Sequence, residues 1–479
     1  MKVNARGARI WWWLLLGLTA GSAGADPVDD TVRSLMEKRD VPGVSIAVIE
    51  GGAIVRTQGY GVVEAGLSEE VSPGTLFQAA SVSKPVAALG ALRLVESGAL
   101  TLDANVNDVL KSWKVPDNDF TAEQKVTLRR LLSHSAGLTV HGFPGYASER
   151  VAATVVQILD GKPPANTAPV RVDRVPGSRN RYSGGGYTVL QQMMMDVTGQ
   201  AFPAYMRSRV LAPLQMSAST YEQPLPAMLA RRAASAHTSR KPARAIPGRW
   251  HVYPEMAAAG LWTTPADLAR FALAIQEAYA GKEGAILGQE LTAEMLTPQS
   301  GNFGLGLVLT GEGVARRFEH GGRNEGFDCH LVAYVEGGRG AVVMINANEN
   351  SGMISRIIEA IADHYGWPEF PKRKPAEIIE DTAPEITAKL VDVLKRFASG
   401  ADLGDLATEE MKAGLTPHRA RIKADFSEYG AVQSVDRVQP APGDPADVYR
   451  HRVAFAGNAI IVRSVFKDGK MSAVSAQPE

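Results

Sequence analysis

The chain has 479 residues, which is too long for a single compact core, so we expect more than one domain. Hydrophobic residues make up 45% of it and charged residues 21%, as is ordinary for a soluble globular protein. Lys plus Arg number 51, as do Asp plus Glu, so the net charge is zero. This balance gives no electrostatic reason to expect nucleic acid or an anionic membrane surface as a partner.

Residues 1–25 have the organisation of an export signal. Basic residues precede an apolar stretch at 10–20, and the small residues Ala23, Gly24 and Ala25 follow at the positions that a signal peptidase needs. The alternative is a membrane anchor, but the apolar stretch is shorter than the roughly 20 residues that span hydrocarbon. We therefore expect cleavage after Ala25, a periplasmic or secreted mature protein, and no stable membrane insertion.

Strand patterns open and close the larger part of the chain. β-Branched residues alternate with smaller ones over 44–54, around a Gly-Gly turn, which predicts a strand–turn–strand unit. A mostly helical middle follows, with a stretch at 86–95 that is apolar on every side and therefore predicted to be buried. A Pro- and Arg-rich loop is expected at 162–179.

Strands are predicted again at 305–309, 329–334 and 340–345, and an amphipathic helix at 354–361. Strands at both ends with helices between them indicate an α+β body, in which one sheet is built from both ends of the sequence.

The C-terminal part is predicted to be a separate small domain. Residues 368–385 are rich in Pro and charge and are interpreted as a linker. An amphipathic helix then begins at Ile386, a second helix is expected near 409–415, and strands at 448–455 and 459–466 are joined by a tight Gly457-Asn458 turn. By pattern alone, 386–479 resembles the small α+β domains of the cystatin or ketosteroid-isomerase kind.

This accessory domain has three candidate roles: binding a ligand, binding a partner, or forming a dimer. Arg450 and Arg452 share one strand face and are able to attract an anion, although an ordinary solvated face explains them equally simply.

Ser81 and Lys84 form a Ser-x-x-Lys motif. On a helix, positions i and i+3 share a face, so the two side chains can meet. A lysine takes the proton of a serine only if its amine is kept neutral, and the apolar stretch that follows provides the necessary burial. Pro85 belongs in the first turn of a helix, which places Ser81 at a helix N-terminus. Taken alone, the motif fits a helix cap beside a surface lysine equally well.

A second copy of this motif, Ser464 and Lys467, falls in a predicted strand. There, positions i and i+3 point to opposite faces, so these side chains cannot cooperate.

Tyr182 begins a Tyr-Ser-Gly sequence. A phenol near a lysine ammonium loses its proton more easily and can relay one between nucleophile and leaving group. The alternative for a loop tyrosine is simple packing.

His320, Gly321, Gly322 and Arg323 follow in the later strand region. Paired glycines in a strand indicate close approach of another backbone or a ligand. An edge strand there would lend the Arg323 backbone N–H to an oxyanion hole shared with the Ser81 N–H. The alternative is a plain turn.

In this order, the three motifs resemble those of the serine β-lactamase and penicillin-binding-protein superfamily, and most of all its class C β-lactamase-like branch of D,D-peptidases and esterases. Further stretches typical of the branch are 77–84, 131–138, 182–199, 260–268 and 304–307.

The resemblance implies a β-lactamase/transpeptidase-like α+β fold, an antiparallel sheet with a helical domain. The expected segments are therefore a signal peptide at 1–25, a serine hydrolase domain at 26–367, a linker at 368–385 and an accessory domain at 386–479.

The resemblance also implies roles for individual residues. Ser81 would be the acylated nucleophile, and Lys84 and Tyr182 would share general acid–base duty. Ser81 and Arg323 would supply the oxyanion N–H groups, with His320 and Gly322 beside them at the substrate. An amide, lactam or ester would acylate Ser81 and the acyl-enzyme would be hydrolysed.

No metal or organic cofactor is expected. The nine histidines form no His-Glu-x-x-His pattern and do not cluster with cysteine. Cys329 is the only cysteine, so no disulfide forms within the chain, and it is predicted to be a small buried hydrophobe without a role.

Two departures from the family pattern concern the substrate. The Asn of Tyr-x-Asn, which binds the acyl amide of a peptide or β-lactam, is Gly184 here. The Lys of Lys-Thr-Gly is His320, which is only partly charged near neutral pH, so Arg323 or Arg181 is the candidate replacement cation. Both changes lower the expectation of efficient antibiotic hydrolysis.

The leading prediction is a hydrolase that cleaves amide, lactam or ester bonds in small-molecule or peptide substrates. The alternative is a slow-acylating penicillin-binding sensor, or a binding module without turnover.

Overall fold

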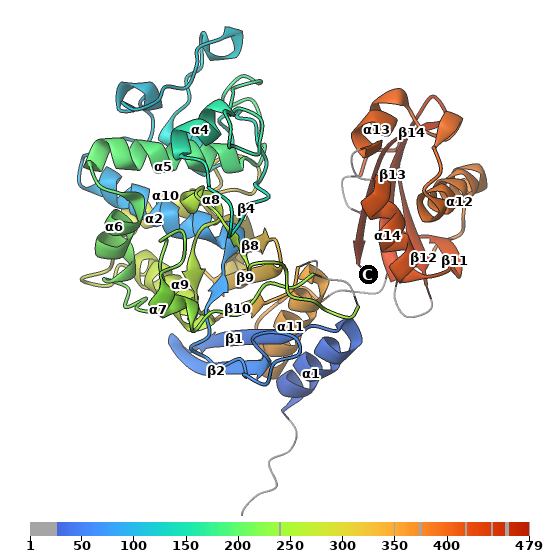
Figure 1. Ribbon diagram of the computed structural model, residues 1–479, viewed down its shortest axis with the longest axis horizontal. Helices are drawn as coiled ribbons and strands as arrows, with labels where there is room; N and C mark the ends of the chain where they lie inside the picture. Colours follow the sequence, from blue (N-terminus) through green and yellow to red (C-terminus); the bar gives the residue numbers. More distant parts are fainter. Residues whose placement is uncertain are drawn as a thin grey trace, which may run out of the picture.

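The computed structural model describes residues 26–238, 241–348, 350–372, 376–416, 419–441, 444–455 and 459–478. Figure 1 shows a large α+β unit that ends with α11 and a smaller α+β unit from α12 to β14. The predicted export signal at 1–25 and the predicted Gly457-Asn458 turn lie outside the described residues. Within the described residues, no helix has the length and apolar character needed to cross a membrane.

A six-stranded antiparallel sheet organises the large unit, in the order β2-β1-β10-β9-β8-β7. Its strands are β1 (Gly43–Glu50), β2 (Ala53–Gly61), β7 (Val308–Thr310), β8 (Arg317–Asn324), β9 (Phe327–Tyr334) and β10 (Gly340–Ile345). The prediction of one sheet built from both ends of this unit is confirmed. The strand expected at 305–309 begins only at Val308, because Gly306, with φ of 97°, bends the chain and donates its N–H to the Leu132 carbonyl.

Two apolar cores lie on opposite faces of this sheet, which is why β1 is buried on both sides. Val48 belongs to the core beneath α1 (Pro27–Arg39) and α11 (Ser351–His364). Its neighbour Ile49 belongs to the larger core on the helical side, since successive side chains of a strand point to opposite faces.

The helical side carries the active-site elements. Its helices are α2 (Ser83–Glu96), α3 (Leu128–Leu132), α4 (Val155–Asp160), α5 (Gly184–Thr198), α6 (Phe202–Met206), α7 (Ala227–Ala230), α8 (Met256–Ala259), α9 (Pro265–Tyr279) and α10 (Gln289–Met295). Two short strand pairs support them: β3 (Phe77–Gln78) with β6 (Trp262–Thr263), and β4 (Tyr146–Ala147) with β5 (His251–Val252). As predicted, α2 is buried almost throughout, and 162–179 is a loop between α4 and α5.

The smaller unit is a four-stranded antiparallel sheet in chain order, with helices. Its elements are α12 (Pro384–Ser399), α13 (Glu409–Leu415), α14 (Arg419–Tyr429), β11 (Ser434–Arg437), β12 (Val448–Ala454), β13 (Ala459–Lys467) and β14 (Lys470–Pro478). The predicted α+β class is confirmed, whereas the likeness to cystatin or ketosteroid isomerase and the domain boundaries stay predictions. Ile379, inside the predicted linker, already donates its N–H to the Arg437 carbonyl at the end of β11.

The second Ser-x-x-Lys motif behaves as predicted for a strand. Ser464 is fully buried in β13 and donates to the Tyr449 carbonyl, whereas Lys467 is exposed. The two side chains do not form a site.

Candidate active site

Ser81 lies in a 3₁₀ turn, η1 (Ala80–Val82), that leads directly into α2. Ala80 has φ of 50°, in the left-handed region that residues with a Cβ rarely adopt, so the turn is strained at the proposed nucleophile. Ser83 fastens this turn, because its Oγ donates to the Ala80 carbonyl at 2.5 Å and accepts the Leu261 N–H at 3.0 Å. The predicted position at a helix N-terminus is confirmed.

Lys84 is positioned as the base for Ser81. Its Nζ lies 3.0 Å from Ser81 Oγ and donates to the Ala258 carbonyl at 2.8 Å. Only 2% of the residue is exposed, and burial lowers its pKa to about 7. A neutral amine that donates one N–H to Ala258 keeps a lone pair for the serine proton. The predicted burial of the lysine is confirmed and its pKa is lowered in the expected direction, whereas its catalytic role stays a prediction.

Tyr182 immediately precedes the N-cap of α5, and its ring centre lies 4.9 Å from Lys84 Nζ. Its phenol shares a side-chain hydrogen bond with Ser81, which favours the ionised form, but burial is the larger effect and raises the pKa of Tyr182 well above the usual value. The expectation of an easily lost proton is therefore wrong for the resting site. Because the phenol keeps its proton, Tyr182 is suited to donate one.

His134 is a site residue that sequence reasoning missed. Its ring stacks on Tyr182 with centres 4.2 Å apart, and its Nδ1 accepts the Ser183 N–H at 3.1 Å. Burial lowers the pKa of His134 well below the usual value, so the ring is neutral and carries its proton on Nε2. His134 thus positions the Tyr182 loop. The only signal was its place in the family-like stretch 131–138.

β8 passes directly beside the nucleophile turn. A Cβ on Gly322 would lie 2.3 Å from the Ala79 carbonyl oxygen and 3.0 Å from Ser81 N, so only glycine permits this approach. The predicted close contact of backbones is confirmed. β7 pairs with β8 only as far as Glu319, and the strand continues past Ser81 beyond that point. The use of the Arg323 N–H in an oxyanion hole stays a prediction.

His320 is uncharged in this setting. It is 3% exposed, and its Nδ1–H donates to the Gly321 carbonyl at 2.6 Å. Burial, and then the charge of Lys84, lower its pKa to about 3, so the partial charge expected from the sequence is absent at pH 7. Its Nε2 has no hydrogen-bond partner in the described part of the chain.

Neither candidate replacement cation is unpaired. The Arg323 Nε donates to Asp328 Oδ1 at 2.9 Å. Arg181 forms an ion pair with Asp173 and donates to the Gly137 carbonyl at 2.8 Å. Arg323 therefore lines the Ser81 cavity as one member of an ion pair. Arg181 is engaged in holding the loop that contains Asp173.

The site opens into a cavity of about 620 Å³. Ser81 and Tyr182 line it together with the aromatic residues Phe143 and Phe303 on one part of the wall. Residues of β8, β9 and the first turn of α11 line another part, including Cys329, which is buried and free as predicted.

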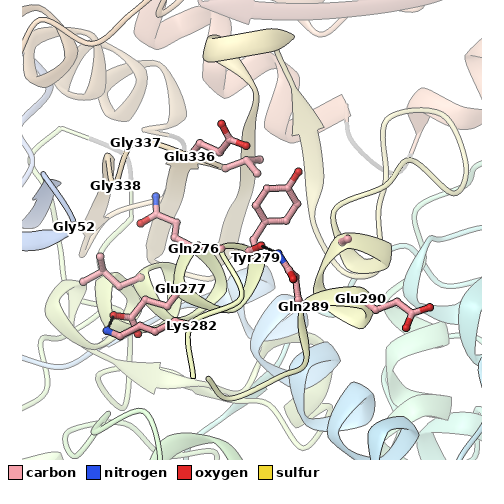
Figure 2. Close-up of a pocket in the computed structure, with 14 residues that line it drawn as sticks. Gly52, Gln276, Glu277, Tyr279, Lys282, Gln289, Glu290, Glu336, Gly337 and Gly338 are labelled. Carbon is pink, nitrogen blue, oxygen red and sulfur yellow. Dashed lines mark hydrogen bonds and ion pairs between the residues drawn. The ribbon is translucent and has the colours of Figure 1, made fainter. Parts of the chain in front are cut away.

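A second cavity, of about 910 Å³, shares no lining residue with the first. Figure 2 shows it beside α9 and α10, where Lys282 is paired with Glu277. Gln289 donates to the Tyr279 carbonyl at 3.1 Å. These side chains include no hydroxyl nucleophile next to an unpaired base, so the chemistry of acyl transfer points to the Ser81 cavity. Among the described residues, no group of three His, Cys, Asp or Glu side chains is placed to hold a metal ion.

Similarity to known proteins agrees with this site. A family model described as Beta-lactamase matches residues 28–365. The chain is 30% identical over 186 residues to Penicillin-binding protein 4 of Amycolatopsis lactamdurans, a match that covers 39% of this chain and 46% of that protein. The chain thus spans less than half the length of the curated relatives it matches.

Two solved structures show the same fold at low sequence identity. The octameric penicillin-binding protein homologue from Pyrococcus abyssi has a TM-score of 0.58 at 20% identity, covering 94% of this chain and 95% of that one. The D-amino acid amidase from Ochrobactrum anthropi SV3 has a TM-score of 0.56 at 22% identity, covering 70% and 99%. With the family model matching most of the sequence, the chain belongs to the beta-lactamase family of serine hydrolases.

Proposed function

We propose that this protein hydrolyses ester or amide bonds, lactams included, through an acyl-enzyme on Ser81. The observation that carries the proposal is the 3.0 Å contact between Ser81 Oγ and Lys84 Nζ, in a setting where burial lowers the pKa of the lysine to about 7. A hydroxyl beside an uncharged amine is an activated nucleophile.

The reaction balances with the residues present. The Ser81 oxygen bonds to the substrate's carbonyl carbon while its proton passes to the Lys84 amine, and backbone N–H groups stabilise the oxyanion. The bond to the leaving alcohol or amine then breaks, and the leaving group takes a proton from Lys84 by way of Tyr182. Water next attacks the acyl carbon, gives its proton back along the same route, and releases a carboxylic acid and free Ser81.

The finer activity is also a proposal. D-Amino-acid peptides, small esters and β-lactams are the candidate substrates. Purified protein should be screened with p-nitrophenyl esters, D-Ala-D-Ala peptides and nitrocefin. Many turnovers per molecule, with an acyl adduct on Ser81 by intact-mass spectrometry and peptide mapping, would support the hydrolase.

The same experiment tests the alternative of a slow-acylating sensor. A sensor would give a burst of one product per protein molecule and a stable adduct, without a steady state. An adduct on another residue, or none with any substrate, would refute both proposals.

We propose further that the protein is exported and that the C-terminal unit mediates dimer formation. The first rests on the pattern of residues 1–25, which cell fractionation and N-terminal sequencing of the mature protein would test. The second rests on the fold of this unit, which has a sheet and an apolar core of its own and so can act as a separate module. Deleting the chain from Ile386 onward and measuring oligomer size and turnover would refute it if neither changed.

A further inference from the structure

An aromatic ring occupies the place where the family pattern has an amide-binding side chain. A Cβ on Gly184 would lie 2.9 Å from Phe143 Cε2 and 3.1 Å from the His141 carbonyl oxygen. The space in which a side chain at 184 would begin is therefore filled by the Phe143 ring. A phenyl ring offers no hydrogen-bonding oxygen or N–H to an acylamino group.

Apolar surface continues on this part of the cavity wall. Phe143 and Phe303 both line the cavity that contains Ser81, and the Phe303 ring packs against His134 with centres 5.0 Å apart. His141 lies beside these rings in the lining, and desolvation, then the charge of Lys84, lower its pKa, which favours the uncharged imidazole. An acyl group placed against Phe143 and Phe303 meets phenyl rings, which offer no hydrogen-bonding atoms.

Another part of the cavity wall, on β9, contains a carboxylate. Asp328, with a side chain only 2% exposed, receives the Arg323 guanidinium through Nε at 2.9 Å and a second N–H at 3.4 Å. It also accepts the backbone N–H of Asn350, the N-cap residue of α11. A cation and a helix N-terminus are the features that attract a substrate carboxylate, and Asp328 already engages both.

The remaining basic residues of this wall are also neutral or paired. His330 Nε2 lies 3.0 Å from Glu319 Oε2, and His320 is uncharged at pH 7, with its Nδ1–H bonded to the Gly321 carbonyl. Within the described wall of this cavity, no cationic side chain is left without a carboxylate partner.

We propose that the site selects uncharged esters or amides with an apolar acyl group, and discriminates against substrates that carry an acylamino group on the acyl side or a carboxylate beside the scissile bond. Phe143 determines the first preference and Asp328 the second. The inference rests on the proposed function, since it names the substrate class of the same site.

The acyl preference is tested with p-nitrophenyl acetate, butyrate and N-acetylglycinate. The wild type should hydrolyse butyrate about tenfold more efficiently than acetate in kcat/KM, since each buried methylene contributes modestly. It should disfavour N-acetylglycinate relative to butyrate. Phe143→Ala should bring the butyrate-to-acetate ratio close to one. Phe120→Ala, which removes an exposed phenylalanine elsewhere, is the matched control and should keep the wild-type ratio.

The charge preference is tested with phenyl butyrate and 3-carboxyphenyl butyrate, which differ only by a carboxylate on the leaving group. The wild type should prefer the uncharged ester. Asp328→Asn should shift the preference about tenfold toward the charged ester, because Arg323 loses its partner. If Asp328→Asn fails to fold, the wild-type ratio of the two esters still tests the charge preference, and a wild-type preference for the carboxylated ester overturns it.

Each outcome bears on a different claim. Turnover through Ser81 with equal rates for acetate and butyrate, or a preference for N-acetylglycinate or the carboxylated ester, would overturn this inference and leave the proposed function intact. No acylation of Ser81 by any ester would overturn both. If Phe143→Ala kept the wild-type ratio of kcat/KM for butyrate to that for acetate, Phe143 would not be the residue that determines the acyl preference.

Discussion

The two sides of Ser81 handle charge in opposite ways. On the helical side, Lys84 and Tyr182 are buried and their pKa values shift toward the neutral forms. On the sheet side, Arg323 forms an ion pair with the buried Asp328. Burial thus favours neutral side chains on one side of Ser81, whereas an ion pair occupies the other; under the proposed function, the first adjusts proton transfer and the second limits which substrates bind.

The strongest test of the helical side is removal of the nucleophile. Ser81→Ala should lower kcat by about a thousandfold or more, because groups that act as a unit are lost together. Steady-state kinetics with a p-nitrophenyl ester and intact-mass spectrometry would measure the turnover and the acyl adduct. Ser464→Ala, in the second Ser-x-x-Lys motif, is the matched control and should behave as wild type. An acyl adduct that persists in Ser81→Ala would show that another residue is acylated and would refute Ser81 as the nucleophile.

Loss of the base should cost nearly as much. Lys84→Met keeps an unbranched buried side chain but has no amine, so kcat/KM should fall by several hundredfold, within the range of ~10²–10⁴-fold that general-base catalysis contributes. Lys467→Ala, an exposed lysine in the other motif, should change nothing. A loss at Lys84 below about tenfold would identify another group as the base.

The pH dependence of kcat/KM tests whether the lowered pKa of Lys84 matters for turnover. The reactive form is the neutral amine, and burial lowers the pKa of Lys84 to about 7. The wild-type kcat/KM should therefore rise tenfold per pH unit below about 7 and level off above it. A plateau that begins only near the ordinary lysine pKa would mean that burial does not tune this side of the site.

Tyr182→Phe should have a smaller effect. The ring and its stacking on His134 remain, and only the proton-donating hydroxyl is lost, so kcat should fall by about a hundredfold. The loss should be greater for an alkyl ester than for a p-nitrophenyl ester, because a poor leaving group needs the proton more. Equal losses for both esters would assign Tyr182 a structural role only.

The sequence predicted the helical side better than the sheet side. Spacing and apolar context placed Ser81 and Lys84 together, because i and i+3 positions of a helix meet whatever the tertiary structure. On the sheet side, Gly322 was predicted to allow close approach of another backbone or a ligand, with a plain turn as the alternative. These inferences needed only local geometry.

Contacts between different segments of the chain could not be predicted from the sequence in the same way. Asp328 follows a tight turn after Arg323, but only the strand register of β8 with β9 brings the two opposite each other. Phe143 reaches Gly184 through a loop whose path no sequence pattern determines. The raised pKa of Tyr182 depends on burial by several segments, so the expectation from Lys84 alone had the wrong sign.

The last prediction concerns a buried acid outside the proposed chemistry. Glu255, the residue before α8, is fully buried, and neither carboxylate oxygen has a hydrogen-bond partner among the described residues. Burial raises its pKa to about 8 from an ordinary 4.5, so the folded state keeps a proton that the unfolded state releases. Stability from this group is therefore lost as pH rises between these two values.

Glu255→Gln keeps the shape and never ionises, so it should remove that loss and raise the free energy of unfolding by about 4 kcal/mol at pH 8, with little effect at pH 4.5. Chemical denaturation across this pH range would measure it, with Glu283→Gln, an exposed site, as the control. The contrary result would be that Glu255→Gln lowers kcat/KM without changing stability. That result would make Glu255 a third proton-handling residue on the helical side, beside Lys84 and Tyr182.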